Sequence, residues 1–117
     1  MDYTAGRQFR ITRDNDVKRL FERGRGAGDG LARMIALPNG LDRPRWAVIV
    51  TKRHGNAVRR NRVKRLAREA LRLSRHQLAA GWDYLLLPRP GADHTLRGLR
   101  ATVVRLGGRV ASGGDQP

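Results

Sequence analysis

The sequence predicts a single domain of the α/β or α+β class, in which helices cover a small sheet. Its 117 residues fit one domain. Hydrophobic residues make up 39% of the chain and charged residues 30%, which provides a modest core beside a strongly ionic surface. An apolar strand, a long helix and a second apolar strand follow one another, in the order of a crossover that covers one face of a sheet.

The first element is a short helix followed by a glycine-rich segment. Residues 12–24 place apolar side chains, among them Val17 and Phe21, on one helical face, and Asp14 is one candidate to cap its start. Residues 24–30 contain four glycines among seven residues. Because glycine is flexible and a weak strand former, this segment is expected to turn without regular structure.

Two strands are predicted next. Residues 31–37 form an apolar run, residues 38–44 contain the turn formers Pro, Asn and Gly, and residues 45–51 alternate as a largely buried strand does. Because only a short turn separates them, the two strands are expected to pair as a hairpin.

The strongest helix prediction covers residues 57–78, which contain no Gly or Pro and are rich in Leu, Ala and Arg. A basic loop, residues 52–56, precedes it. With 3.6 residues per turn the helix has two faces. The packing face consists of Val63, Leu66, Ala67, Ala70 and Leu71, and the charged face consists of Lys64, Arg65, Arg68, Arg72 and Arg75.

The remaining segments complete one domain over residues 1–110. Residues 82–87 form a buried strand, which ends at two prolines. Residues 94–110 indicate a final helix, interrupted by glycines. The last residues, 111–117, are expected to be a disordered tail.

The net charge points to a nucleic-acid partner. The chain has 25 Lys and Arg against 10 Asp and Glu, a net charge of +15. Most of the cations are Arg, whose planar group forms paired hydrogen bonds with phosphate, although biased genome composition would produce the same excess. The absence of Cys excludes disulfides and thiolate metal sites. Without an apolar leader or a membrane span, the sequence predicts a soluble, cytoplasmic protein.

The positive charge is concentrated in residues 52–75, which hold ten cations and a single acid, Glu69. Contact with six to eight phosphates would give a log-log salt dependence of roughly 4 to 7, at ~0.7 to 0.9 per contact. A solvated helix face is the alternative. It is disfavoured because like charges at i, i+3 and i+4 repel one another and acidic partners are nearly absent.

The order of residues 51–69, TKRHGNAVRRNRVKRLARE, resembles the signature of the bacterial ribonuclease P protein family. The family pattern centres on an Arg-Asn-Arg triplet, here Arg60, Asn61 and Arg62. Flanking segments fit in order, including the helix that contains Phe21 and the strand that begins at Trp82. The resemblance covers about residues 7–106.

This resemblance implies a two-layer sandwich with about four strands, a left-handed crossover around the long basic helix, and helices near both ends of the chain. It also implies that a catalytic RNA subunit, with bound Mg²⁺, removes the 5′ leader of precursor tRNA. The protein would assist substrate binding and metal affinity, with no catalytic side chain and no cofactor or metal of its own. The expected partners are therefore the RNA subunit and precursor tRNA, not DNA or a membrane.

The resemblance assigns two binding surfaces to this sequence. The surface for the RNA subunit would consist of Lys52, Arg53, Asn56, Arg60, Asn61, Arg62, Lys64, Arg65 and Arg68. The surface for the leader would consist of Arg10, Arg13, Val17, Phe21, Ile35 and Val48. Val17 and Ile35 stand where the family pattern has aromatic residues, so base stacking would depend on Phe21. The alternative for Phe21 is a place in the core.

Other functions remain as alternatives. A structural RNA-binding protein of the ribosomal type would also be small, basic and α/β. A DNA-binding role through the long helix lacks a helix-turn-helix pattern, because a loop and a strand flank that helix. The three histidines, His54, His76 and His94, are far apart in the sequence and make a zinc site improbable. Asp83 and Arg89 are candidates for a local ion pair.

Overall fold

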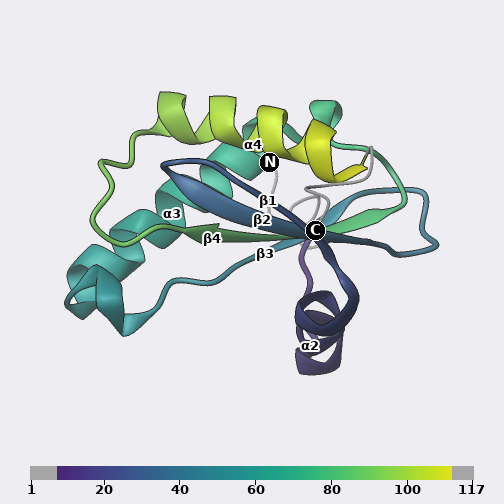
Figure 1. Ribbon diagram of the computed structural model, residues 1–117, viewed down its shortest axis with the longest axis horizontal. Coiled ribbons are helices and arrows are strands. Elements are labelled where there is room, and N and C mark those ends of the chain that lie inside the picture. Colours follow the sequence, from purple (N-terminus) through teal and green to yellow (C-terminus); the bar gives the residue numbers. More distant parts are fainter. Residues whose placement is uncertain (1–7, 112–117) are drawn as a thin grey trace.

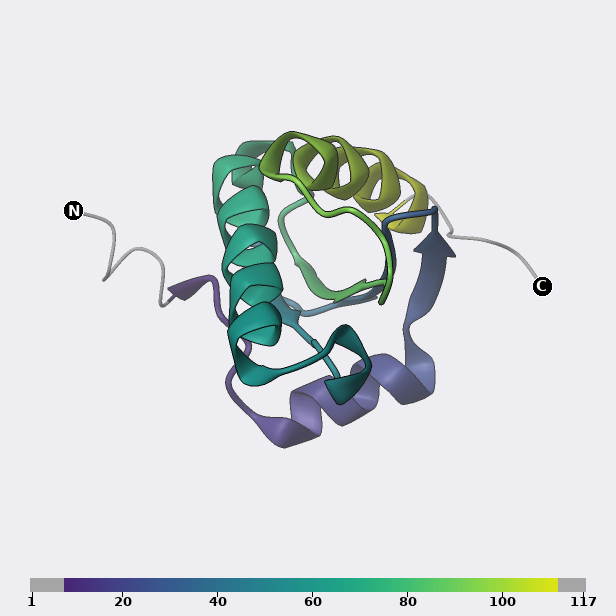
Figure 2. The ribbon, with the colours of Figure 1, turned by 90° about the vertical axis from the view of Figure 1, so that its left-hand side faces the viewer.

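The computed structural model of the protein describes residues 8–111, which form helices on both faces of a four-stranded sheet (Figure 1). The helices are α2 (Asp14–Arg23), α3 (Ala57–Leu73) and α4 (Leu96–Ala111), and the strands are β1 (Arg25–Gly28), β2 (Ala32–Pro38), β3 (Arg45–Val48) and β4 (Trp82–Pro88). Single 3₁₀ turns precede and follow α3, namely η1 (Lys52–His54) and η2 (Arg75–Gln77). Helices α3 and α4 lie on one side of the sheet and α2 on the other (Figure 2). The predicted class is confirmed.

The strand order is β1-β2-β4-β3, which differs from the expected hairpin of β2 with β3. Strand β4 lies between them, antiparallel to β2 and parallel to β3. The connection through α3 returns the chain to the middle of the sheet. There β4, the most continuously apolar strand, has a partner on each side, as a strand buried on both faces requires.

The glycine-rich segment also differs from its prediction, because residues 25–28 form β1 and pair antiparallel with β2. Ala27 is fully buried against the core, and this burial together with the ladder offsets the weak strand propensity of glycine. Gly24 is needed at the end of α2. A Cβ there would lie 2.3 Å from Cγ2 of Ile35 and 2.5 Å from the carbonyl oxygen of Leu20.

Other element boundaries also shift. Helix α3 ends at Leu73, before the predicted residue 78, and η2 follows it. Asp14 does not cap α2: Arg13 occupies the N-cap position, with no side-chain hydrogen bond. The predicted tail begins at residue 111, which belongs to α4, and residues 112–117 lie outside the described part of the chain.

The sheet separates two apolar clusters. The larger cluster lies between the sheet and helices α3 and α4, and it includes Met34, Trp46, Val48, Ala67, Leu71, Tyr84, Leu86, Leu99, Val103 and Leu106. The smaller cluster lies on the α2 side and has Ile11, Leu20, Ile35 and Leu85 at its centre. Among residues 8–111, no helix combines the length and the hydropathy that a membrane crossing requires.

A carboxylate at the β1–β2 turn fastens the beginning of the sheet to the final helix. Asp29 accepts hydrogen bonds from the backbone N–H groups of Leu31 (2.8 Å) and Ala32 (3.0 Å) and from Oγ1 of Thr102 in α4 (2.9 Å), and it pairs with Arg105. Burial by itself would raise the pKa of Asp29. The hydrogen bonds, led by that of Arg105, outweigh burial and lower the pKa to about 2.

Low pH should therefore weaken the attachment of the β1–β2 turn to α4 through Asp29. Because the folded-state pKa is depressed, Asp29 stabilises the fold fully above its ordinary pKa of 3.8, and this contribution is lost as the pH falls towards about 2. We expect Asp29→Asn to lower the melting temperature at pH 7, and the difference from the wild type to shrink below pH 3.8. Thermal melts across this range check it. A difference that did not change with pH would contradict the assignment.

Candidate nucleic-acid interface

The start of α3 is built by two residues that precede it. Gly55 has φ of +112°, a conformation that favours glycine, and it turns the chain from η1 into the helix. Asn56 caps the helix, since its Oδ1 accepts a hydrogen bond from the backbone N–H of Arg59 at 3.0 Å. Asn61, considered as a capping residue or an RNA reader, lies inside the helix and is exposed. It is therefore free to contact RNA, whereas Asn56 already has a structural role.

Helix α3 has the two faces that its periodicity predicted. Ala67, Ala70 and Leu71 are fully buried against the sheet and α4, whereas Val63 and Leu66 are half-buried at the margin. We call the opposite side the outward face of α3; its exposed polar residues are Asn61, Arg62, Arg65 and Arg68. Arg60 and Lys64 lie half-buried along one edge.

Two cations of the predicted charged face have partners within the protein. Arg72 forms an ion pair with Glu69 at 2.6 Å, which occupies the one acid of this helix. Nη1 of Arg75 donates to the carbonyl oxygen of Arg72 at 2.8 Å. These contacts fix the end of α3, so the cations that lack an acidic partner in the described chain lie before them in the helix.

The other cations of the helix have no acidic partner within residues 8–111; they are Arg59, Arg60, Arg62, Lys64, Arg65 and Arg68. The Nε of Arg60 is buried and has no hydrogen-bond acceptor in this range. A buried donor without an acceptor costs free energy, so a phosphate oxygen that reached it would be favourably bound.

The two predicted surfaces meet at Arg10 and Arg68. Partial burial and, after it, the nearby charge of Arg10 lower the pKa of Arg68 from its ordinary value. The backbone of Arg10 forms an isolated parallel β-bridge with Trp46 of β3, and Arg68 belongs to α3. Repulsion between two guanidinium groups is relieved by an anion placed between them, which makes this position suitable for a phosphate.

The loop before α3 is held against the sheet. Lys52 and Arg53 are exposed in η1, and the ring Nε2 of His54 is 2.8 Å from the carbonyl oxygen of Pro88 at the end of β4. His54 also approaches His94, with ring centroids 5.8 Å apart, although 40 residues separate the two in sequence. No group of three or more His, Asp or Glu side chains suited to a metal ion occurs among the described residues.

The structure places the residues of the predicted leader surface on two different sides of the sheet. Val17 and Ile35 belong to the cluster between α2 and the sheet. Phe21 is 53% exposed on α2, so it is not a core residue. Val48 faces the opposite side of the sheet and is buried in the larger core. Because side chains alternate along a strand, its half-buried neighbours Ala47 and Ile49 face α2 instead.

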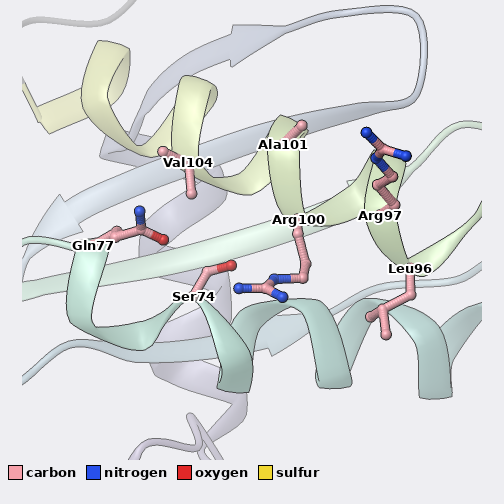
Figure 3. Close-up of a pocket in the computed structure, with 7 residues that line it drawn as sticks. All are labelled: Ser74, Gln77, Leu96, Arg97, Arg100, Ala101 and Val104. Carbon is pink, nitrogen blue, oxygen red and sulfur yellow. The ribbon is translucent and has the colours of Figure 1, made fainter.

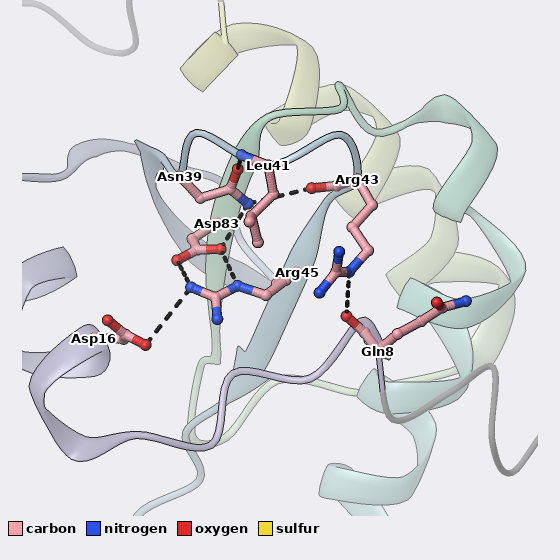
Figure 4. A network of polar contacts seen from close by, with 7 residues as sticks. All are labelled: Gln8, Asp16, Asn39, Leu41, Arg43, Arg45 and Asp83. Carbon is pink, nitrogen blue, oxygen red and sulfur yellow. Dashed lines mark hydrogen bonds and ion pairs between the residues drawn. The ribbon is translucent and has the colours of Figure 1, made fainter.

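An ion-pair network that sequence reasoning missed attaches α2 to the sheet (Figure 4). Arg45 donates two hydrogen bonds to Asp83, at 2.9 and 2.7 Å, and lies 3.6 Å from Asp16 of α2. Asp83 also accepts from Nδ2 of Asn39 at 2.9 Å. Arg89, the partner suggested from the sequence, instead donates to the carbonyl oxygen of Asp29 at 2.5 Å. The structure thus replaces the predicted local pair with a long-range one.

Known proteins are similar to this chain in sequence and in fold. The family model described as Ribonuclease P matches residues 6–110. The chain belongs to the ribonuclease P protein family. It is 33% identical over 96 residues to the ribonuclease P protein component of Petrotoga mobilis, covering 82% of this chain and 81% of that one. The corresponding protein of Roseiflexus castenholzii is 37% identical over 102 residues, with coverage of 86% and 84%.

A solved structure of the ribonuclease P family agrees with the fold. The ribonuclease P protein from Thermotoga maritima superimposes with a TM-score of 0.76 at 25% identity, covering 86% of this chain and 96% of that one. The membership inferred from the Arg60-Asn61-Arg62 segment is thereby confirmed.

Proposed function

We propose that this chain is the protein subunit of a ribonuclease P, which binds the catalytic RNA subunit and promotes endonucleolytic removal of the 5′ leader from precursor tRNA in the cytoplasm. The observation that carries the proposal is the group of cations without acidic partners on and beside the outward face of α3, together with the buried, unpaired Nε of Arg60. In this proposal the RNA subunit, with its own Mg²⁺, cleaves the substrate. The protein supplies binding.

The physical basis is neutralisation of phosphate by guanidinium groups on an ordered helix. Helix α3 presents Arg62, Arg65 and Arg68 from a backbone that already packs against the core, so binding RNA costs side-chain entropy but little backbone entropy. Arg68 and Arg10 already repel each other, and an RNA phosphate would remove that repulsion. Lys52 and Arg53 extend the positive surface towards η1.

Reconstitution tests the proposal directly. Ribonuclease P RNA at low Mg²⁺ should cleave precursor tRNA slowly by itself and rapidly when this chain is added, because the protein offsets the repulsion that Mg²⁺ otherwise screens. An unrelated basic protein at the same charge concentration is the control. Absence of rescue would favour a structural RNA-binding protein of the ribosomal type. Preferential binding to duplex DNA over folded RNA would favour a DNA-binding role for the long helix.

For the leader, we infer contact with the partly covered sheet face beside α2. Half-buried Val17, Ala47 and Ile49 supply apolar surface there, and Phe21 offers an exposed aromatic ring. Arg10 and Arg13, both exposed, lie at the beginning of α2 and could neutralise the leader backbone. Stacking on one ring tolerates any base, which suits leaders of different sequence.

Replacing Phe21 should therefore affect only substrates that carry a leader. We expect Phe21→Ala to weaken holoenzyme binding to precursor tRNA by about fivefold or more, since base stacking contributes ~1 to 3 kcal/mol. Mature tRNA should bind unchanged. Leu41→Ala, which removes another exposed apolar side chain, is the matched control. Equal losses for tRNA with and without leader would exclude this role for Phe21.

A further inference from the structure

A cavity of about 470 Å³ lies between α4 and the end of α3, away from the outward face of α3 and from α2 (Figure 3). Its volume falls within the range of small-molecule sites, roughly 300 to 1,000 Å³. It is lined by Ser74, Gln77, Leu96, Arg97, Arg100, Ala101 and Val104. None of the residues assigned above to the RNA subunit or to the leader takes part in it.

The hydroxyl of Ser74 lacks a partner in this cavity. Ser74 follows α3 and is 1% exposed, and its Oγ forms no hydrogen bond with any residue of the described chain. Figure 3 shows this oxygen directed into the space between the two helices. Buried hydroxyl groups nearly always have a partner, so the cavity offers a hydrogen-bonding position that a bound molecule would fill.

The charge of the lining selects an anion. Arg97 and Arg100 are the ionisable residues of the lining, and no carboxylate takes part in it. The side chain of Arg100 extends from α4 towards Ser74, whereas that of Arg97 leaves α4 in the opposite direction, away from Ser74 (Figure 3). Neither forms an ion pair within residues 8–111. A phosphate near Arg100 would accept charge-assisted hydrogen bonds.

The rest of the lining suits a ring attached to that anion. Val104 of α4 offers apolar surface on the same side of Arg100 as Gln77, and the amide of Gln77 in η2 adds a donor and an acceptor (Figure 3). Leu96 lies on the other side of Arg100. An inorganic anion would leave the apolar surface of Val104 unused. A molecule that combines a phosphate, hydroxyl groups and a flat apolar ring would use Arg100, Ser74 and this surface together.

We propose that this cavity binds a nucleoside monophosphate unit. Its phosphate lies on Arg100, a ribose hydroxyl bonds Oγ of Ser74, and the base lies against Val104 and Gln77 on the same side of Arg100. Such a unit can be a free nucleotide or a single nucleotide that projects from an RNA strand. Because the lining shares no residue with the surface assigned to the RNA subunit, occupation of the cavity is not expected to compete with binding of that subunit.

The test is a titration of the isotope-labelled full chain, followed by nuclear magnetic resonance. Adenosine 5′-monophosphate should produce saturable shifts in the amides of residues 74–77 and 96–104. Ser74→Ala should weaken this binding about 3- to 10-fold, as the loss of one hydrogen bond does, and Arg100→Gln about 10-fold or more. Ser74→Ala should not lower the melting temperature, because the hydroxyl has no partner to lose. Arg19→Gln on α2 removes the same charge and should bind as the wild type does.

Three further arms decide between explanations. Inorganic phosphate that bound at the same residues with the same affinity would overturn the nucleotide assignment, and so would shifts confined to Arg65 and its neighbours on α3. Unchanged affinity in Ser74→Ala would mean that water satisfies the hydroxyl, which also overturns it. A short single-stranded RNA that shifts residues 96–104 more strongly than the free nucleotide would support the site and identify RNA as its source. Ser74→Ala should assemble normally with ribonuclease P RNA, so this site and the proposed function can fail separately.

Discussion

Charge reversal of both Arg65 and Arg68 to Glu is expected to weaken assembly with ribonuclease P RNA about 100-fold or more, because two charge-assisted contacts of ~1.5 to 3 kcal/mol each are lost and two repulsions replace them. Both side chains are exposed, and neither has an acidic partner within residues 8–111. The fold should therefore be unaffected. Filter binding or calorimetry at several salt concentrations measures the effect.

The salt dependence makes this test specific. Removing two phosphate contacts should reduce the slope of log affinity against log salt by roughly 1.4 to 1.8, at ~0.7 to 0.9 per contact. Lys18→Glu with Arg19→Glu on α2 changes the net charge by the same amount and is the control for long-range attraction. If both double variants lost the same affinity, general charge and not the outward face of α3 would explain binding. A double variant that did not fold would contradict the exposure of these residues.

Asp83→Ala is expected to destabilise the fold by about 3 to 5 kcal/mol, because the largely buried guanidinium of Arg45 then keeps only Asp16, at 3.6 Å, as an acidic partner. The side chain of Asp83 is only 10% exposed, and it holds Arg45 through two hydrogen bonds and Asn39 through a third. The hydrogen bond to Asp83, opposed by burial, raises the pKa of Arg45 above its usual value. Arg45 stays charged after Asp83 is removed, because a guanidinium remains protonated at neutral pH without such help. Chemical denaturation measures the change in unfolding free energy.

Asp42 provides a matched control for Asp83. It pairs with Arg43 at 3.5 Å, but its side chain is 93% exposed, and exposed pairs contribute little. We expect Asp42→Ala to unfold as the wild type does. Equal stability of Asp83→Ala and Asp42→Ala would show that the Arg45 network does not hold the sheet together. Replacing Arg45 by Met as well as Asp83 by Leu should recover part of the loss, since the guanidinium that lost its main partner is then absent, although Asp16 loses its contact with Arg45.

Periodicity predicted the features that depend on local sequence. The two faces of α3 follow from positions that repeat every 3.6 residues, and the buried strand that begins at Trp82 follows from a continuous apolar run. The residue order around Asn61 predicted the family. Each of these signals lies within one element, where side-chain spacing and backbone geometry are directly related.

Features that depend on which elements meet were not predictable in this way. The sequence does not show that β4 enters between β2 and β3, so the β2–β3 hairpin was a natural but wrong inference. Asp83 pairs with Arg45, which is 38 residues away in the sequence, and not with the nearby Arg89. Val48 was misplaced for another reason: its alternation with Ala47 was visible, but the side of the sheet that α2 covers was not. The exposure of Phe21 likewise depends on how α2 lies on the sheet.

The central position of β4 also determines when the domain can form during synthesis. Strands β2 and β3 are complete by residue 48, yet they do not pair with each other, and each depends on a strand that begins at residue 82. Most of the chain must therefore be synthesised before the four strands can pair. Until β4 has been synthesised, helix α3 lacks the complete sheet against which it packs, and its apolar side is uncovered. Apolar surface that stays uncovered during synthesis favours aggregation, so the incomplete chain is more prone to aggregate than the finished domain.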